Sequence, residues 1–266
     1  MGRSCVAAKK VVPVLTEVLR SGYYPDDSNR RIINEEYHQY IFIQEDRFKL
    51  LSGVARMNKG KSHFNGDNFL ISRLECGKAI AAIADGMGSG KRAYIESRMV
   101  IELMENCIDA GFDEKASIDL INSAYIAGGG TGNPVTMDMS VIDCQSGYMH
   151  CMKLGAVSTF IRRDKWVEII QSTTLPMGVL EQVDYDCTTK KLYDGDYIVM
   201  VSDGVLDNIP CVNKEERMAQ MIHALTIREP SAMAEKLLEQ SLAYNDMKAS
   251  DDCTVLVLGL FDTYEK

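Results

Sequence analysis

The order of the elements predicts an α+β fold: a four-layer α/β/β/α sandwich in which two antiparallel sheets pack together and a helix pair covers each outer face. Strand-like runs dominate the 266 residues and come in two groups, each followed by two helical segments, before one last strand. Hairpin-type turns such as Gln145-Ser146-Gly147 join neighbouring strands, which indicates antiparallel pairing. A hydrophobic content of 46% is enough for a sizeable core.

Residues 1–45 form a lead segment ahead of a single domain over residues 46–266. The lead segment is expected to hold a helix over residues 5–20, whose start Pro13 limits, and a polar loop over residues 22–35. Whether the lead segment is regulatory or a linker stays open.

The first β-rich group is followed by two helices. Apolar and β-branched runs predict strands over Tyr37–Ile43, Phe48–Met57, Asn68–Cys76 and Ala79–Ala84. Apolar residues that recur every four positions predict a helix over residues 91–110, which Gly111 ends. A second helix is expected over residues 114–127.

The second β-rich group has the same plan. Strands are expected over Met137–Cys144, Tyr148–Leu154, Ser158–Arg162, Val167–Ile170, Tyr185–Leu192 and Tyr197–Val201. Two helices follow over residues 214–226 and 230–245, with Ser231 expected near the N-cap of the second. The strand Thr254–Phe261 completes the chain.

Composition excludes several classes of function. The formal net charge is −9 and the pI about 5.0, and the chain has no basic stripe of the kind that binds nucleic acid. No apolar stretch approaches the roughly 20 residues of a membrane-spanning helix, so no membrane segment is expected in this chain. The cysteines form no CxxC pair and the four histidines lie far apart, which argues against a zinc site.

Aspartates lie beside apolar strands at three places. Asp85 and Asp203 each follow a continuous apolar run, and the pair Asp251-Asp252 precedes the last strand. A carboxylate at the end of a buried strand is costly unless a cation or several donors face it. Oxygen-only ligands suit Mg²⁺ or Mn²⁺, and two such ions that share one carboxylate can activate a water molecule. The pattern therefore favours a metal-dependent hydrolase that acts on phosphate.

These segments allow two other interpretations. An Asp-Gly step after a strand is a common turn, so a metal-free signalling domain in which the aspartates only make turns stays open. The glycine-rich run that ends at Gly90-Lys91 also suggests a phosphate-binding P-loop. Asp85 stands where that loop needs its first glycine, and Arg92 stands where it needs Ser or Thr, so a P-loop is not predicted.

Taken together, the motifs resemble the PP2C-type phosphatase superfamily, and within it the branch of stage II sporulation protein E. The resemblance rests on the turn Asn65–Asn68 and on the segments Asp85–Lys91, Leu175–Gly178, Val201–Val205 and Asp251–Val255. Each segment alone is weak, but their order and surroundings are specific. The resemblance implies a β-sandwich flanked by helix pairs, with two Mn²⁺ or Mg²⁺ ions between the sheets.

The resemblance also implies roles for individual residues. Asp85 is expected to bridge both ions, and the carbonyl oxygen of Gly86 to bind the second. Asp203 and one of the pair at 251–252 are expected to bind the first ion, with Asp251 favoured. Asp67 is expected to hold a metal-bound water. Asp85, Asp203 and Asp251 are thus the expected catalytic residues.

The implied reaction is the hydrolysis of phosphoserine on an anti-anti-sigma factor by a metal-activated water, which regulates the activation of a sporulation sigma factor. The implied setting is the cytoplasmic domain of a protein anchored in the cell membrane, and a homo-oligomer is compatible with it. A catalytically silent module that binds a phosphoprotein is the alternative.

Two parts of the implied mechanism have no assigned side chain. Met87 stands where many members of the superfamily carry a histidine, so the acid for the leaving group is open. No arginine for the phosphate is evident, although Arg56, Lys59 and Lys61 lie close to Asp67 in the sequence.

Overall fold

The computed structural model describes residues 5–74, 77–127, 133–164 and 166–263. It divides into two compact units, Met1–Arg47 and Phe48–Lys266. None of the helices in these ranges is both long and apolar enough to cross a membrane.

In residues 5–47, the first unit has one α-helix, one short 3-10 helix and two small strand pairs. Strand β1 (Val6–Ala7) pairs with β3 (Ile32–Ile33), and β2 (Tyr23–Pro25) pairs with β4 (Phe42–Gln44). After the short 3-10 helix η1 (Ala8–Lys10), helix α1 covers only Val12–Leu19.

Two expectations for this unit were wrong. The helix expected over residues 5–20 begins late because Pro13 lies in its first turn, where a proline is tolerated, and the chain before it pairs with β3. The strand expected over Tyr37–Ile43 is confined to β4, which begins at Phe42.

The second unit contains two five-stranded antiparallel sheets. The β7 sheet has the order β12–β9–β8–β7–β6, and the β14 sheet has the order β11–β10–β13–β14–β5. The strands of the β7 sheet are β6 (Asp67–Arg73), β7 (Lys78–Gly86), β8 (Val135–Asp143), β9 (Tyr148–Leu154) and β12 (Asp186–Lys191). Those of the β14 sheet are β5 (Phe48–Met57), β10 (Thr159–Arg162), β11 (Val167–Ile170), β13 (Tyr197–Val201) and β14 (Cys253–Asp262).

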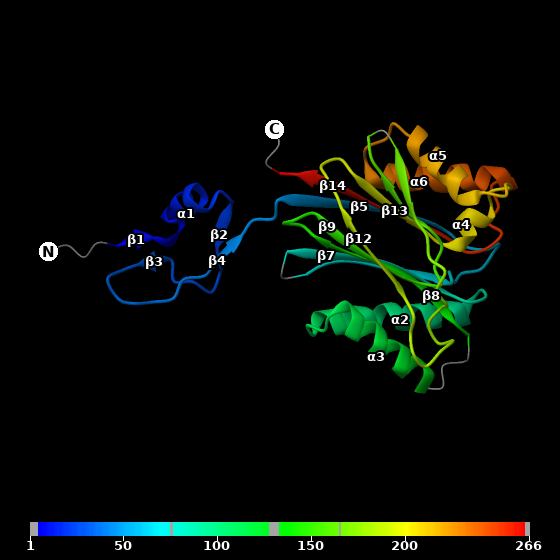
Figure 1. Ribbon diagram of the computed structural model, residues 1–266, viewed down its shortest axis with the longest axis horizontal. Helices are drawn as coiled ribbons and strands as arrows, with labels where there is room; N and C mark the ends of the chain where they lie inside the picture. The colour runs from blue at the N-terminus through cyan, green and yellow to red at the C-terminus, as the bar shows by residue number, and fades with distance from the viewer. Residues whose placement is uncertain (1–4, 75–76, 128–132, 165, 264–266) are drawn as a thin grey trace. The chain divides into compact units, whose positions relative to one another are not determined.

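Helices cover the outer face of each sheet, as Figure 1 shows. Helices α2 (Lys91–Asp109) and α3 (Glu114–Ala127) accompany the β7 sheet, while α5 (Lys214–Ala224) and α6 (Pro230–Leu242) accompany the β14 sheet. The remaining helical turns are α4 (Asp203–Asp207) and the 3-10 helix η2 (Ala243–Asn245).

Three hydrophobic clusters fill the spaces between these four layers. Val100, Met104 and Ile118 pack against the β7 sheet, and Ile222 and Leu237 pack against the β14 sheet. A third cluster lies between the two sheets and includes Ile83, Ile142, Met200 and Leu258. Two five-stranded antiparallel sheets flanked by helices form the predicted four-layer α+β sandwich, so the predicted fold class is confirmed.

The second unit differs from the expected elements in the ends of some of them and in one additional helix. Strand β7 continues through Asp85 to Gly86, so Asp85 lies within the strand instead of after it. Helix α4, which begins at Asp203, was not expected. Ser231 lies in the first turn of α6, near the N-cap as expected; the N-cap itself is Glu229, whose carboxylate accepts hydrogen bonds from the backbone N–H groups of Ser231 and Ala232, at 2.9 Å and 2.6 Å. Cys76, at the expected end of β6, lies outside the described residues.

Candidate metal centre

Strand register brings the first two aspartates together. Asp67 begins β6 and is paired with Asp85 in the antiparallel ladder, so both side chains point to the same face of the β7 sheet. Ile83 lies two residues before Asp85 and belongs to the cluster between the sheets. The two carboxylates therefore point toward the space between the sheets.

Asp67 is fully buried, and neither of its carboxylate oxygens has a hydrogen-bond partner. Burial raises the pKa of Asp67 to about 6, with a smaller effect of the carboxylates of Asp203 and Asp252 in the same direction. The hydroxyl groups of Thr254 and Ser202 lie near enough to oppose the shift, but they do not reach hydrogen-bond geometry with these oxygens. A buried carboxylate without hydrogen-bond partners is costly in its charged form, and a bound cation would remove that cost.

Asp85 and Asp203 extend this acidic group toward solvent. Burial raises the pKa of half-buried Asp85 to about 9, and the carboxylates of Asp67, Asp203 and Asp251 add to the shift. Asp203 begins α4 directly after Ser202 and is exposed. Its pKa is also raised, mainly by desolvation of its carboxyl group and to a smaller extent by the nearby carboxylate of Asp207. We call Asp67, Asp85, Asp203 and Asp251 the aspartate cluster. Asp67 and Asp85 lie in the β7 sheet, whereas Asp203 begins α4 after β13 and Asp251 lies just before β14. The cluster runs from a buried to an exposed end.

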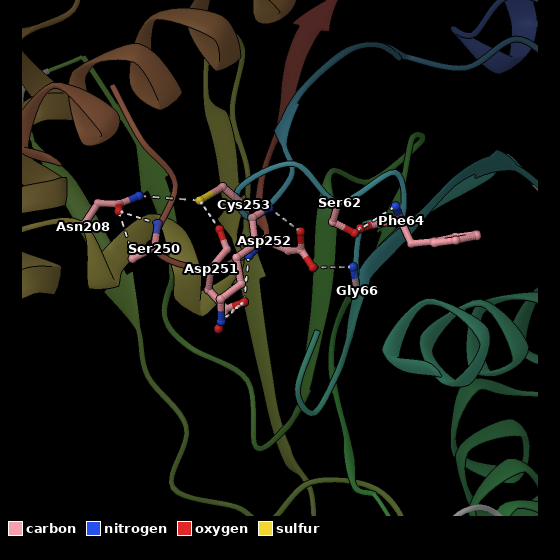
Figure 2. A network of polar contacts seen from close by, with 9 residues as sticks. Ser62, Phe64, Gly66, Asn208, Ser250, Asp251, Asp252 and Cys253 are labelled. Carbon is pink, nitrogen blue, oxygen red and sulfur yellow. Dashed lines mark hydrogen bonds and ion pairs between the residues drawn. The ribbon is translucent and has the colours of Figure 1, made fainter. Parts of the chain in front are cut away.

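The adjacent Asp251 and Asp252 differ in their surroundings. Asp252 is buried, and its two carboxylate oxygens accept backbone N–H bonds from Lys59 and Gly66, both at 2.8 Å. Figure 2 shows this carboxylate pointing at the Gly66 amide, which joins the start of β14 to the turn before β6. Asp251 has a partly exposed carboxylate, and one of its oxygens accepts the N–H of Asp252 at 2.9 Å. Asp251 is therefore the member of the pair with oxygen free for a cation.

Glycines next to the aspartates permit close backbone approach. A Cβ on Gly204 would lie 2.1 Å from the carbonyl oxygen of Asp252, and a Cβ on Gly86 would lie 2.3 Å from the carbonyl oxygen of Ala93 in α2. Any side chain at either position would push the 251–252 segment or the start of α2 away from the cluster. The glycines of the two Asp-Gly steps thus allow the end of β7 to pack closely on α2 and the start of α4 to pack closely on the 251–252 segment. Their role is therefore not limited to making turns.

The donor set fits divalent cations of the Mg²⁺ or Mn²⁺ type. It consists of carboxylate oxygens, two of them buried and unpartnered, and their mutual repulsion is relieved by positive charge. Across the described parts of the chain, no three Asp, Glu, His or Cys side chains are already arranged as the ligand set of one metal ion. An ion of this type keeps several waters as ligands, so the carboxylates need not be closed around its position before it binds.

Two basic residues near the cluster were not assigned from the sequence. The Arg56 guanidinium donates to the carbonyl oxygen of Asp67 and lies 5.6 Å from the centre of the Phe69 ring. The Lys59 ammonium lies 3.5 Å from a carboxylate oxygen of Asp251. In the sequence, only their closeness to Asp67 pointed to a place near the site. The contact of Lys59 with Asp251 could not be predicted in this way, because it joins distant parts of the chain.

Comparison with known proteins identifies the family. The sequence pattern of the family described as "Stage II sporulation protein E (SpoIIE)" matches residues 76–261, which is well over half of the chain. The chain belongs to the SpoIIE family. Its members are PP2C-type serine phosphatases, so the expected enzyme class is confirmed.

Two stage II sporulation E proteins are similar over almost the whole chain. Those of Bacillus subtilis (strain 168) and Priestia megaterium are each 30% identical over 253 residues, or 95% of this chain. The chain spans only 31% and 43% of their respective lengths.

Solved structures agree with the fold. The PP2C phosphatase domain of SpoIIE from Bacillus subtilis with a fragment of its regulatory domain has a TM-score of 0.81 at 27% identity, covering 98% of this chain and 79% of that one. The same phosphatase domain in a crystal form without domain swapping has a TM-score of 0.67 at 30% identity, with coverages of 84% and 96%. RsbX, solved in complex with magnesium, has a TM-score of 0.62 at 20% identity, with coverages of 81% and 97%.

Proposed function

We propose that this SpoIIE-family domain is a Mn²⁺- or Mg²⁺-dependent protein serine phosphatase whose centre is the aspartate cluster. The observation that carries the proposal is the meeting of carboxylates from the β7 sheet and from the segments next to β13 and β14 around Asp67, whose buried oxygens have no hydrogen-bond partner. Such an arrangement is unfavourable for folding and is retained where a function needs it.

We propose a ligand role for each residue of this group. Asp85, at the middle of the cluster, is proposed to contact both ions; Asp203 and Asp251 contact one, and the Gly86 carbonyl contacts the other. Asp67 is proposed to orient a water from its buried position. When bound, the divalent cations supply the Lewis acidity that activates water for attack on phosphorus. The magnesium in the RsbX structure supports this type of cation.

The remaining residues hold this arrangement in place. Asp252 ties Lys59 and Gly66 to the start of β14, and Arg56 fixes the backbone at Asp67. Met87 is exposed and offers no proton, so we propose no side chain of this chain as acid for the leaving serine.

We propose a phosphoserine on an anti-anti-sigma factor as the substrate, whose dephosphorylation leads to activation of a sporulation sigma factor. The two sporulation proteins of spore-forming bacteria support this choice. We also propose that the domain acts in the cytoplasm as part of a longer, membrane-anchored protein. The greater length of these relatives supports the first element of this proposal, a longer protein.

The test is the release of phosphate from a phosphoserine-bearing anti-anti-sigma factor, measured against Mn²⁺ concentration. Wild-type protein should show Mn²⁺-dependent release, and Asp85→Asn should lower it by at least about a thousandfold. The charge-matched control is Asp119→Asn, on the exposed face of α3, which should behave as wild type.

A folding readout accompanies this assay. Burial and the carboxylate neighbours already disfavour the charged form of Asp85 in the metal-free protein, and Asp85→Asn puts a neutral amide there, so the metal-free variant should not melt below wild type. No release from any phosphoserine protein at millimolar Mn²⁺, with a folded wild-type protein, would refute the proposed activity. Release from other phosphoserine proteins alone would refute only the proposed substrate.

A further inference from the structure

Lys59 brings a positive charge to the exposed end of the aspartate cluster. Its ammonium lies 3.5 Å from a carboxylate oxygen of Asp251, although the two residues are far apart in the sequence. The backbone N–H of the same lysine donates to Asp252 at 2.8 Å. The main chain at Lys59 is thus fixed to the 251–252 segment, while its side chain reaches along the edge of the cluster.

The loop that carries Lys59 is held by its own hydrogen bonds. The Asn58 side chain donates a hydrogen bond to the carbonyl oxygen of Ser62 at 3.0 Å. The backbone N–H of Ser62 donates one to the carbonyl oxygen of Lys59 at 3.2 Å. The Asn65 amide donates to the Asn58 side chain at 3.0 Å. These bonds fix the backbone from which the lysine side chain extends to Asp251.

The ion pair between Lys59 and Asp251 does not account for this placement by its own stability. Both side chains are substantially exposed, 43% and 37% respectively, and a pair of this kind contributes little to folding. The ammonium can therefore leave Asp251 at small cost for a stronger anionic partner. Arg56 is less suited to this, because its guanidinium already donates to the Asp67 backbone and lies over Phe69.

Charge balance indicates what that partner is. Four ionised carboxylates and two divalent cations have no net formal charge, so the proposed metal centre alone has little long-range attraction for a phosphate dianion. One ammonium at its exposed end gives the excess positive charge, and it donates charge-assisted hydrogen bonds that strengthen as the phosphate gains negative charge.

We propose that Lys59 is a substrate-binding residue whose ammonium contacts a phosphate oxygen of the phosphoserine, and of the phosphate released from it. This assignment rests on the proposed phosphatase activity for its substrate. It has a separate test in the binding of inorganic phosphate to the metal-loaded chain.

The experiment compares Lys59→Ala, Lys59→Arg and the control Lys61→Ala, an exposed lysine on the same loop, in the full chain. Calorimetry measures Mn²⁺ affinity first and then the affinity of the Mn²⁺-loaded protein for inorganic phosphate. Phosphate affinity should fall by roughly ten- to hundredfold in Lys59→Ala, the range for a hydrogen bond to a charged group. It should remain close to wild type in Lys61→Ala and be largely restored in Lys59→Arg.

Mn²⁺ affinity separates this role from a structural one. Removing a positive charge beside Asp251 should leave Mn²⁺ binding unchanged or tighten it. If Lys59 only held Asp251 in place, Mn²⁺ binding would weaken in Lys59→Ala, and that result overturns the assignment. Unchanged phosphate affinity in Lys59→Ala, or no phosphate binding by wild type, also overturns it.

Failure of the proposed function gives a different pattern. A wild-type chain that binds phosphate through Lys59 but hydrolyses no phosphoserine protein would refute the phosphatase activity and keep the lysine assignment. If the wild type is active and Lys59→Ala keeps the phosphate affinity and the KM of the wild type, the lysine assignment is refuted and the phosphatase activity stands.

Discussion

At the scale of single residues, two neighbouring aspartates have separate tasks. Both oxygens of Asp252 are taken by the backbone N–H groups of Lys59 and Gly66, so it joins the ends of two sheets. The Asp251 carboxylate faces solvent, Lys59 and the rest of the aspartate cluster. The sequence alone leaves the choice between them open, because both are acidic and adjacent.

This difference predicts that alanine at position 252 affects stability, whereas alanine at position 251 affects Mn²⁺ binding. Asp252→Ala leaves two backbone N–H groups without their acceptor and should lower the free energy of unfolding by about 2–4 kcal/mol. Asp251→Ala should leave stability within about 0.5 kcal/mol of wild type and weaken Mn²⁺ binding. Denaturant unfolding and calorimetry measure the two effects. A destabilised Asp251→Ala with normal Mn²⁺ affinity would show that the roles are reversed.

The sequence predicts the site residues that follow a local pattern, but not the contacts that depend on strand pairing. Asp85 and Asp203 were identifiable because each follows an apolar run, but Asp85 lies inside β7 and Asp203 begins a helix. The pairing of Asp67 with Asp85 is set by strand register, which depends on the whole β6–β7 hairpin. The contact of Lys59 with Asp251 depends on the pairing of β5 with β14, which the sequence does not reveal.

At the scale of elements, packing glycines join strands to the helices that cover them. A Cβ on Gly86 at the end of β7 would meet the Ala93 carbonyl at 2.3 Å, and one on Gly53 in β5 would meet the Ser231 backbone nitrogen at 2.2 Å. The first contact lies beside the aspartate cluster and the second lies at the start of α6. Each fixes how closely a helix approaches its sheet.

These two glycines predict a separable pair of effects. Gly86→Ala should displace the end of β7 or the start of α2 and weaken Mn²⁺ binding by roughly ten- to hundredfold. Gly53→Ala should lower the free energy of unfolding by about 1–3 kcal/mol through overpacking, with normal Mn²⁺ affinity in the folded protein. Ser52→Ala, an exposed neighbour on β5, is the control. Equal Mn²⁺ affinity in both glycine variants would contradict a link between α2 packing and the site.

Elements with strong periodicity were predicted well. Residues 114–127 are helical as expected, and Phe48–Met57, Tyr148–Leu154 and Tyr197–Val201 are strands with the expected ends. The first unit was predicted poorly, because its strands have two or three residues and depend on pairing with each other. Short strands of this kind leave no periodic signal in the sequence.

At the scale of the whole molecule, the layers of the second unit bring the site together. The three hydrophobic clusters draw all their residues from the chain after Arg47. A buried contact also joins the sheets: Asp138 in β8 pairs with Lys153 at 2.6 Å and accepts a hydrogen bond from Thr159 in β10. The aspartate cluster likewise needs both sheets, so it forms only when the sandwich does.

The second unit should therefore fold and bind metal by itself. A chain of residues 48–266 should melt within about 2–4 °C of the full chain, the shift expected for 1 kcal/mol, and bind Mn²⁺ with the same affinity. Calorimetry on the two chains, scanned under matched conditions, measures both quantities. An unfolded shorter chain would show that residues 1–47 complete the core.

The central claim is that the aspartate cluster binds divalent cations, and anomalous diffraction at the manganese edge tests it most directly. Crystals of the wild-type chain soaked in Mn²⁺ should show two anomalous peaks, both about 2–2.5 Å from carboxylate oxygens of Asp85. Crystals of Asp85→Asn should lose at least one of them. Saturating Mn²⁺ with no peak at Asp85, or with peaks only elsewhere on the molecule, would contradict the account.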